Sequence, residues 1–258
     1  MADVWHQYNS RGSIFVLDNH PPYRKEVVRY LDLVGSTYSG RTLFRYCNRY
    51  SGRRIEIRPF VPTPNNPVNS GTDAKVNADA FMQGQPLRKA DGTTVSPPST
   101  GTGTGSDATV RYHPANQRQF VANMNMILPG SGPGEVLFHE LIHAMGAVHG
   151  LWLSTVVPEN SKMGNFDEFC SIAAANLYRS ERGFKIMRDS HDGHDPLEKA
   201  LSDSQLYYDW YKNEFTQWFR IQRDFCVDLA NSHAAFNPFK WAAIDLKILA
   251  APKPSMRL

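Results

Sequence analysis

Cysteine is scarce in this sequence, which has three thiols, Cys47, Cys170 and Cys226, in 258 residues. Their number is odd, they lie far apart, and the spacing C-x-x-C does not occur. This pattern argues against a disulfide framework and against a zinc site made of thiolates, because both need paired or closely grouped cysteines. Thiols that stay buried suit a reducing compartment and a periplasm equally well.

Long apolar runs are also missing. No stretch approaches the roughly 20 apolar residues that a membrane-spanning helix needs, so no integral membrane segment is expected. The first residues, Met-Ala-Asp-Val-Trp-His, lack the basic stretch and apolar run of a secretory signal peptide. We therefore expect a protein that is cytoplasmic in its producer, or one that is secreted or translocated into a target cell without a cleavable signal peptide.

A large excess of one charge is absent as well. The chain has 28 Lys and Arg residues against 25 Asp and Glu residues, a net charge of +3. This mild excess does not indicate a nucleic-acid interface, which would weaken steeply with salt. One basic and aromatic run comprises Arg41, Arg45, Tyr46, Arg49, Tyr50, Arg53 and Arg54. A helix with an adjacent basic face explains this run, so no nucleic-acid partner is expected.

The composition does provide for one hydrophobic core. Hydrophobic residues make up 41% and charged residues 21% of the chain, as in ordinary globular proteins. We expect a single domain over residues 1–258. Residue patterns predict strands at 14–17, 54–58 and 109–113, the last closed by Pro114, and helices at 26–34, 42–49 and 167–182.

Two further stretches have a distinct composition. Residues 59–106 are rich in Pro, Gly and Thr, which predicts a long loop with a small hairpin inside it. The C-terminal part is rich in aromatic residues at helical spacing, which predicts helices packed through a common core. These aromatic residues are Tyr207, Trp210, Tyr211, Phe215, Trp218, Phe219 and Phe225.

One expected helix carries metal-binding chemistry. Residues 132–135 are typical of a helix start, since proline is tolerated in the first turn and Glu135 suits the positive end of the dipole. His139, Glu140 and His143 then match the pattern H-E-x-x-H. Residues four apart share a helix face, so the two histidines can bind one Zn²⁺ ion. Glu140 would lie beside that ion and take a proton from a water that attacks a carbonyl.

A catalytic zinc needs a third protein ligand and an open position for water. His149, together with Gly146, completes the longer pattern H-E-x-x-H-x-x-G-x-x-H of metzincins, and Met163 is available as the methionine below the metal. Glu168 would instead give a site of two histidines and one glutamate, and its neighbour Asp167 could substitute for it.

Helix geometry separates these candidates. His149 lies six residues after His143, about 600° of rotation at 3.6 residues per turn, so an unbroken helix directs it away from the metal. It reaches the metal only if the chain breaks at Gly146, which glycine permits but does not force. Glu168 faces no such requirement, because a separate helix can bring it alongside.

Segments around the motif carry a resemblance to a known family. They are 31–37 (LDLVGST), 40–41 (GR), 55–57 (IEI), 105–114 (GSDATVRYHP), 137–144 (LFHELIHA), 166–172 (FDEFCSI) and 176–183 (NLYRSERG). Over about residues 26–194 the chain resembles the zinc metallopeptidase effectors that bacterial pathogens inject by type III secretion. It is also similar to the metallopeptidase domains of type VI secretion spike proteins.

The resemblance implies a zincin-like α+β fold, with a small mixed sheet packed on the motif helix and a helical C-terminal part. It implies that Glu168 is the third zinc ligand and that Gly150 ends the motif helix, which leaves His149 incidental. It also implies peptide-bond hydrolysis by a bacterial effector or toxin. The partners would be a protein substrate and an immunity protein or secretion-spike component.

Two alternatives remain open from the sequence. One is a metzincin-type peptidase with His149 as third ligand, and the other is a non-catalytic recognition module whose zinc is closed by a fourth protein ligand. Three residues are candidates to donate a hydrogen bond to the oxyanion of a tetrahedral intermediate, namely Tyr178, His191 and His194.

Overall fold

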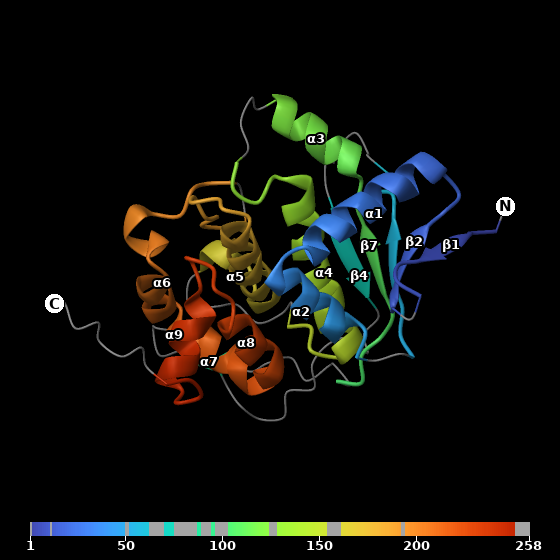
Figure 1. Ribbon diagram of the computed structural model, residues 1–258. Helices are drawn as coiled ribbons and strands as arrows, with labels where there is room; N and C mark the ends of the chain where they lie inside the picture. Colours follow the sequence, from blue (N-terminus) through green and yellow to red (C-terminus); the bar gives the residue numbers. More distant parts are fainter. Residues whose placement is uncertain are drawn as a thin grey trace.

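The chain has a mixed α/β fold in which helices surround one small sheet (Figure 1). The computed structural model describes residues 2–10, 12–49, 52–61, 70–74, 87–88, 94–95, 103–123, 128–153, 161–191 and 194–250. Within these ranges, no helix is both long and apolar enough to cross a membrane.

The main sheet has five strands in the order β1-β2-β3-β7-β4. These strands are β1 (Trp5–Gln7), β2 (Ile14–Leu17), β3 (Ile55–Arg58), β7 (Ala108–Arg111) and β4 (Gly71–Ala74). The three central strands β2, β3 and β7 are parallel, and β1 and β4 pair antiparallel to the two sides of this group. The sheet is therefore small and mixed, as the sequence predicts.

Alternation of side chains explains which face of the sheet is covered. In β3 and β7 the residues Ile55, Ile57, Ala108 and Val110 are buried, and the residues between them are more exposed. Ile55 pairs with Ala108 and Ile57 with Val110, so these side chains share one face. Thr72 pairs with Val110 and therefore points to the same face.

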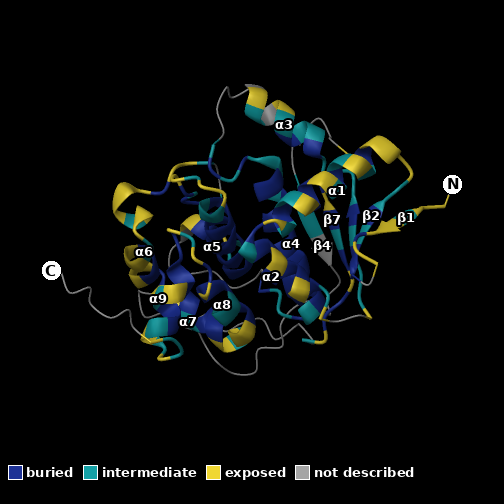
Figure 2. Ribbon diagram, viewed as in Figure 1, coloured by how far each residue is buried: buried dark blue, intermediate teal, exposed yellow. Residues whose placement is uncertain are grey.

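Helices α1 (Pro21–Gly35), α2 (Tyr38–Cys47), α4 (Pro133–His149) and α5 (Phe166–Glu181) build the core around this face. The helix α4 contacts β4, β7, α1, α2 and α5, and it lies between the sheet and α5 (Figure 1). Figure 2 shows that α4 is buried over almost its whole length, in agreement with its mainly apolar sequence.

The helices α4 and α5 run antiparallel. Glu135 in the first turn of α4 pairs with Arg179 near the end of α5, and His143 contacts Asp167 in the first turn of α5. All four of these side chains are buried. The helices α4 and α5 are thus joined by buried polar contacts at two separated points along their interface.

The C-terminal part is helical, as predicted. It consists of α6 (Ser204–Trp210), α7 (Lys212–Ile221), α8 (Arg223–Ala230) and α9 (Pro238–Asp245), preceded by short turns η2 (Ser161–Met163) and η3 (Lys199–Ser202). In Figure 1 these four helices gather around α5, away from the strands.

Aromatic packing joins these helices to α5, which confirms the prediction of a common core. Phe169 of α5 lies 5.2 Å from Phe215 and 5.3 Å from Tyr211, measured between ring centroids. The prediction is wrong for Trp210, whose side chain is 60% exposed. It follows three residues after Tyr207, which is buried, and it lies at the last position of the short helix α6, where it turns to solvent.

Two elements differ from the sequence prediction. The expected loop over 59–106 contains the strand β4, which pairs with β7 and which the sequence does not predict. The two-stranded sheet of β5 (Leu87–Arg88) and β6 (Thr94–Val95) in the same stretch confirms the predicted small hairpin. The other difference is α3 (Pro114–Asn123), because Pro114 begins a helix instead of only closing a strand. Proline suits the first helical position, where no N–H partner is needed.

Candidate metal centre

The helix α4 positions three polar side chains of the H-E-x-x-H motif in the interior. His139, Glu140 and His143 have exposed fractions of 9%, 6% and 6%. The helix begins after Gly132 with a proline in its first turn and ends at Gly150, whose φ of 68° is left-handed. A Cβ at Gly150 would lie 2.3 Å from the carbonyl oxygen of Gly103, so this end of the helix requires glycine.

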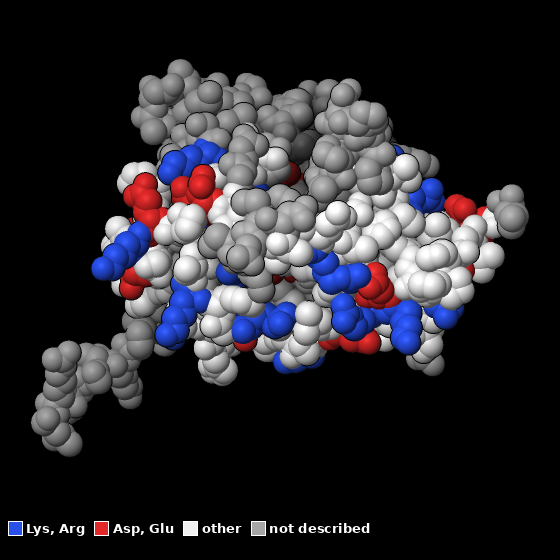
Figure 3. Space-filling model, turned by 90° about the horizontal axis from the view of Figure 1, so that it is seen from above, with Lys and Arg blue, Asp and Glu red and all other residues white. Residues whose placement is uncertain are grey.

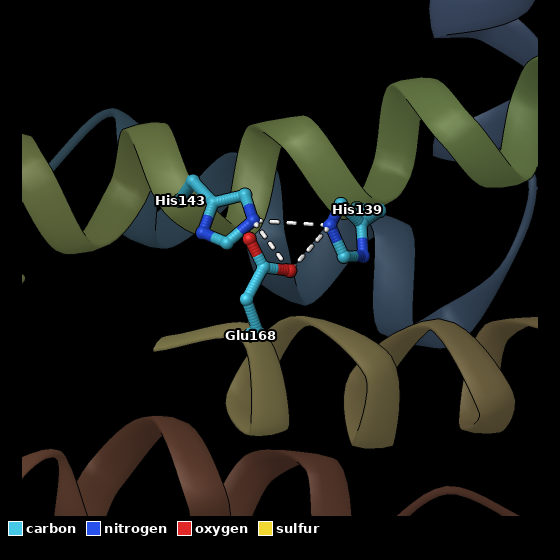
Figure 4. A group of neighbouring side chains, drawn as sticks. All are labelled: His139, His143 and Glu168. Atoms are coloured by element: carbon cyan, nitrogen blue, oxygen red, sulfur yellow. Dashed lines mark hydrogen bonds and ion pairs between the residues drawn. The ribbon is translucent and has the colours of Figure 1, made fainter. Parts of the chain in front are cut away.

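The first turn of α5 brings a carboxylate to the two histidines (Figure 4). The Nε2 atoms of His139 and His143 are 3.0 Å apart, and Glu168 Oε2 lies 3.2 Å and 3.4 Å from them. Three ligands at about 2.0–2.1 Å from a tetrahedral zinc would be separated by roughly 3.3–3.4 Å. The three atoms are therefore spaced as the ligands of one small metal ion would be.

One oxygen of this group lacks a hydrogen-bond partner among the described residues. Glu168 Oε2 is buried and receives no hydrogen bond of acceptable geometry from the described residues, although it faces both imidazole rings. A buried carboxylate oxygen without a partner is costly. A cation between Glu168, His139 and His143 satisfies it, so the side chains present fit a metal.

The ionisation of Glu168 and His139 suits a cation, whereas His143 would first have to give up a proton. Burial would raise the pKa of Glu168, but the neighbouring His143 and His139 hold it well below its usual range. Burial lowers the pKa of His139 and thereby favours the neutral imidazole that binds metals. Burial also disfavours the charged form of His143, but Asp167 and Glu168 outweigh this and raise its pKa well above the ordinary value.

Asp167 lies on the far side of His143 from Glu168. Its Oδ2 contacts His143 Nδ1, and Ser171 Oγ lies 3.2 Å from the same nitrogen. A partner on Nδ1 fixes the ring so that Nε2 faces the metal, an arrangement common behind histidine ligands. Asp167 is thus placed to orient a ligand, and it is not in the His139, His143 and Glu168 group.

His149 does not belong to the group of His139, His143 and Glu168. The helix α4 continues unbroken through Gly146, as the rotation argument requires. His149 Nε2 donates a hydrogen bond to the backbone oxygen of Tyr46 at 2.9 Å. Met163 is fully buried, and the structure does not bring His149 to the group at Glu168.

Glu140 faces the strand at the edge of the sheet. Its Oε1 accepts a hydrogen bond from Ser70 Oγ at 2.8 Å, and its Oε2 accepts one from Thr72 Oγ1 at 2.9 Å. Thr72 Oγ1 also lies 3.0 Å from the backbone oxygen of Glu140. Ser70 and Thr72 could not be predicted as site residues, since a short Ser-Gly-Thr segment in a Pro- and Gly-rich stretch carries no recognisable signal.

A cavity of about 460 Å³ opens onto these residues. Its wall includes the three candidate ligands, Glu140 and the strand β4, and it continues along α4 and α5 towards Glu135 and Arg179. Among the described residues, the group that could hold a metal has three members. A metal bound there would therefore keep a coordination position open to the cavity.

The three candidates for oxyanion binding occupy different places. Tyr178 is buried, stacks on Phe138 with ring centroids 4.7 Å apart, and does not line the cavity. His194 lines the cavity, and its Nδ1 donates to the backbone oxygen of Pro129 at 3.0 Å. His191 also lines the cavity, with Nε2 3.4 Å from Glu168 Oε1. His191 is therefore the candidate beside the metal-binding group.

The basic run after Arg41 does not form a continuous basic patch. Arg45 pairs with Asp228 at 3.0 Å and Arg49 with Asp224 at 3.3 Å. On the face seen in Figure 3, Lys and Arg side chains are interspersed with Asp and Glu side chains. The arrangement offers no support for a phosphate-binding surface.

Comparison with known proteins adds no assignment. No family model matches the chain, and a search of curated proteins finds no match.

Proposed function

We propose that this protein is a zinc-dependent metallopeptidase with His139, His143 and Glu168 as zinc ligands and Glu140 as general base. The observation that carries the proposal is the spacing of three ligand atoms at 3.0–3.4 Å on the wall of a cavity that Glu140 also lines. A structural zinc site would normally be closed by a fourth protein ligand. The group of three favours a catalytic site.

Each residue has a task in hydrolysis. Zinc, when bound, supplies a Lewis acid that polarises the scissile carbonyl and makes water acidic, with a pKa near 7. Glu140 takes the proton of the attacking water as the new C–O bond forms. It then gives this proton to the leaving amine as the C–N bond breaks. His191 is the neighbouring group that can donate a hydrogen bond to the oxyanion.

The strand β4 supports a peptide as the substrate. It lies at the end of the strand order, and Gly71 and Thr72 line the cavity. A Cβ built at Gly71 would meet no atom of the described residues within 4 Å. An extended peptide can pair with such an edge through backbone hydrogen bonds.

The proposal includes the family and the biology that the sequence resemblance implies. A zincin-like fold is supported by the mixed sheet packed on α4, with the antiparallel strand β4 next to Glu140. On this proposal the protein is a bacterial effector or toxin that acts on a protein substrate. An immunity protein or a secretion-spike component would be its other partner.

Metal analysis combined with one substitution tests the proposal. Protein purified without added metal should contain close to one zinc per chain and should cleave a peptide library. Glu140→Gln should keep the zinc and lower kcat/KM by about 10²–10⁴-fold. Iron in place of zinc would contradict the proposal, because two histidines and a carboxylate also hold Fe(II) in oxygenases. Undiminished cleavage by Glu140→Gln would contradict it as well.

A further inference from the structure

The strand β4 and the candidate base Glu140 are joined by side-chain hydrogen bonds that a peptidase mechanism does not itself require. Ser70 and Thr72 each place a hydroxyl within 2.9 Å of one carboxylate oxygen of Glu140. Ser70 and Glu140 are 70 residues apart in the sequence, so the contact depends on the tertiary fold.

We infer that Thr72, assisted by Ser70, is a positioning residue that holds the Glu140 carboxylate in the orientation for proton transfer; the inference rests on the proposed function. A glutamate side chain on a helix can rotate about several bonds, whereas a carboxylate held at both oxygens keeps one orientation. A carboxylate has about four lone-pair sites, so two hydroxyl donors leave sites for a water molecule.

The position of Thr72 follows from the sheet. Thr72 pairs with Val110 of β7, and both side chains point to the face that α4 covers. Its hydroxyl lies near both the carboxylate and the backbone oxygen of Glu140, and each of these groups can only accept a hydrogen bond. The single hydroxyl proton is therefore directed to Glu140 in either case, and preferentially to the charged carboxylate.

The same strand also lines the cavity at Gly71. A peptide paired with β4 would thus lie next to the element that fixes the base. Thr72 would then set the geometry of the base relative to the bound substrate.

The test compares Thr72→Val, which removes the hydroxyl and keeps the shape, with Thr72→Ser, which keeps the hydroxyl. On a cleavable peptide, we expect Thr72→Val to lower kcat about 10- to 100-fold, because a misplacement of roughly 1 Å costs about 10²-fold. KM and zinc content should remain those of the unchanged protein. Thr72→Ser should recover kcat to within about threefold, and Ser70→Ala should show a smaller loss than Thr72→Val.

Thr109→Val is the matched control. Thr109 lies on β7 opposite Asp73, and strand alternation places it on the face away from Val110. It should leave kcat and KM unchanged. An unchanged kcat in Thr72→Val, while Glu140→Gln is inactive, would overturn the inference and leave the proposed function standing. Loss of zinc or of folded structure in Thr72→Val would also overturn it, because the role would then be structural.

Discussion

Two neighbouring carboxylates at the start of α5 differ in what they contact. Glu168 faces the Nε2 atoms of both histidines, while Asp167 contacts only the Nδ1 atom of His143. Their pKa values are displaced in opposite directions, since burial raises that of Asp167 and the histidines lower that of Glu168 against the effect of burial. Consecutive helix positions point about 100° apart, which allows one to bind a metal and the other to orient a ligand.

Substitution of each candidate ligand should separate these tasks. We expect Glu168→Ala to lose zinc, because it removes one of three ligands. Asp167→Asn should weaken zinc binding about 10–100-fold, as removal of the group behind a histidine ligand generally does. His149→Gln should bind zinc as tightly as the unchanged protein. Competition with a chromophoric chelator measures all three, and zinc loss in His149→Gln with retention in Glu168→Ala would identify a metzincin site instead.

At the scale of elements, β4 packs against α4. This packing surrounds the Glu140 carboxylate with hydroxyl groups, and β4 also forms the strand edge proposed to bind a peptide. Among the described residues, a Cβ built at Gly71 meets no atom within 4 Å, and the φ of Gly71 is not in the left-handed region, so a larger residue fits there without backbone strain. Gly71 pairs with Arg111 and precedes Thr72, so the added side chain would point to the face away from Val110, beside the edge of β4.

Gly71→Leu should therefore interfere with peptide binding. We expect KM to rise about tenfold or more, with zinc content unchanged, because the added side chain stands beside the strand edge along which an extended substrate would pair with β4. Steady-state kinetics with a peptide substrate gives the answer. Gly52→Leu is the control, because a Cβ at Gly52 also meets no atom within 4 Å in the part of the chain that the structure describes, and Gly52 does not line the cavity. An unchanged KM in Gly71→Leu would place the substrate elsewhere.

The sequence predicts the elements whose signals are local. The spacing of His139 and His143 is a property of one helix and is found where expected. The helix ends at Gly150, as the family resemblance implies. The strand β4 could not be predicted, because Gly, Asp and Ala are depleted in strands and its stability comes from pairing with β7. The contact of Thr72 with Glu140 could not be predicted either, since it exists only once β4 has paired with β7.

For the whole molecule, the arrangement of sheet, α4 and helical C-terminal part could be anticipated, but the cavity between them could not. Its walls combine β4, α4, α5 and the segment of His191, which are far apart in the chain. Hydrophobic periodicity tells which face of each element is buried, but it does not tell which polar side chains meet across an interface.

Half-buried histidines away from the metal group influence the stability of the fold as a whole. Burial lowers the pKa of His149, in spite of its hydrogen bond to the Tyr46 backbone, and burial likewise lowers those of His113 and His194. The folded state thus favours the neutral form of each, while the unfolded chain titrates near pH 6.5. Stability from these groups is present above about pH 6.5 and is lost as the pH falls below it.

His149→Gln should reduce this pH dependence. Between about pH 7.5 and about pH 5, its free energy of unfolding should fall less than that of the unchanged protein, by at most about 1.4 kcal/mol per pH unit. Urea unfolding at the two pH values measures the free energy of unfolding of both proteins. A chelator is present throughout, so that metal binding does not contribute to the result. His233→Gln, at an exposed position, should parallel the unchanged protein. Identical slopes for His149→Gln and the unchanged protein would contradict the prediction.

The two polar contacts that join α4 and α5 bear on whether folding or metal binding comes first. Glu135 with Arg179, and His143 with Asp167, are formed between protein groups alone. The separation of the helices is therefore set by the chain itself, in contrast to zinc fingers, which stay unfolded until zinc arrives. On the proposed function, we expect zinc-free protein to be folded and inactive. The zinc supply of its compartment would then decide when activity begins.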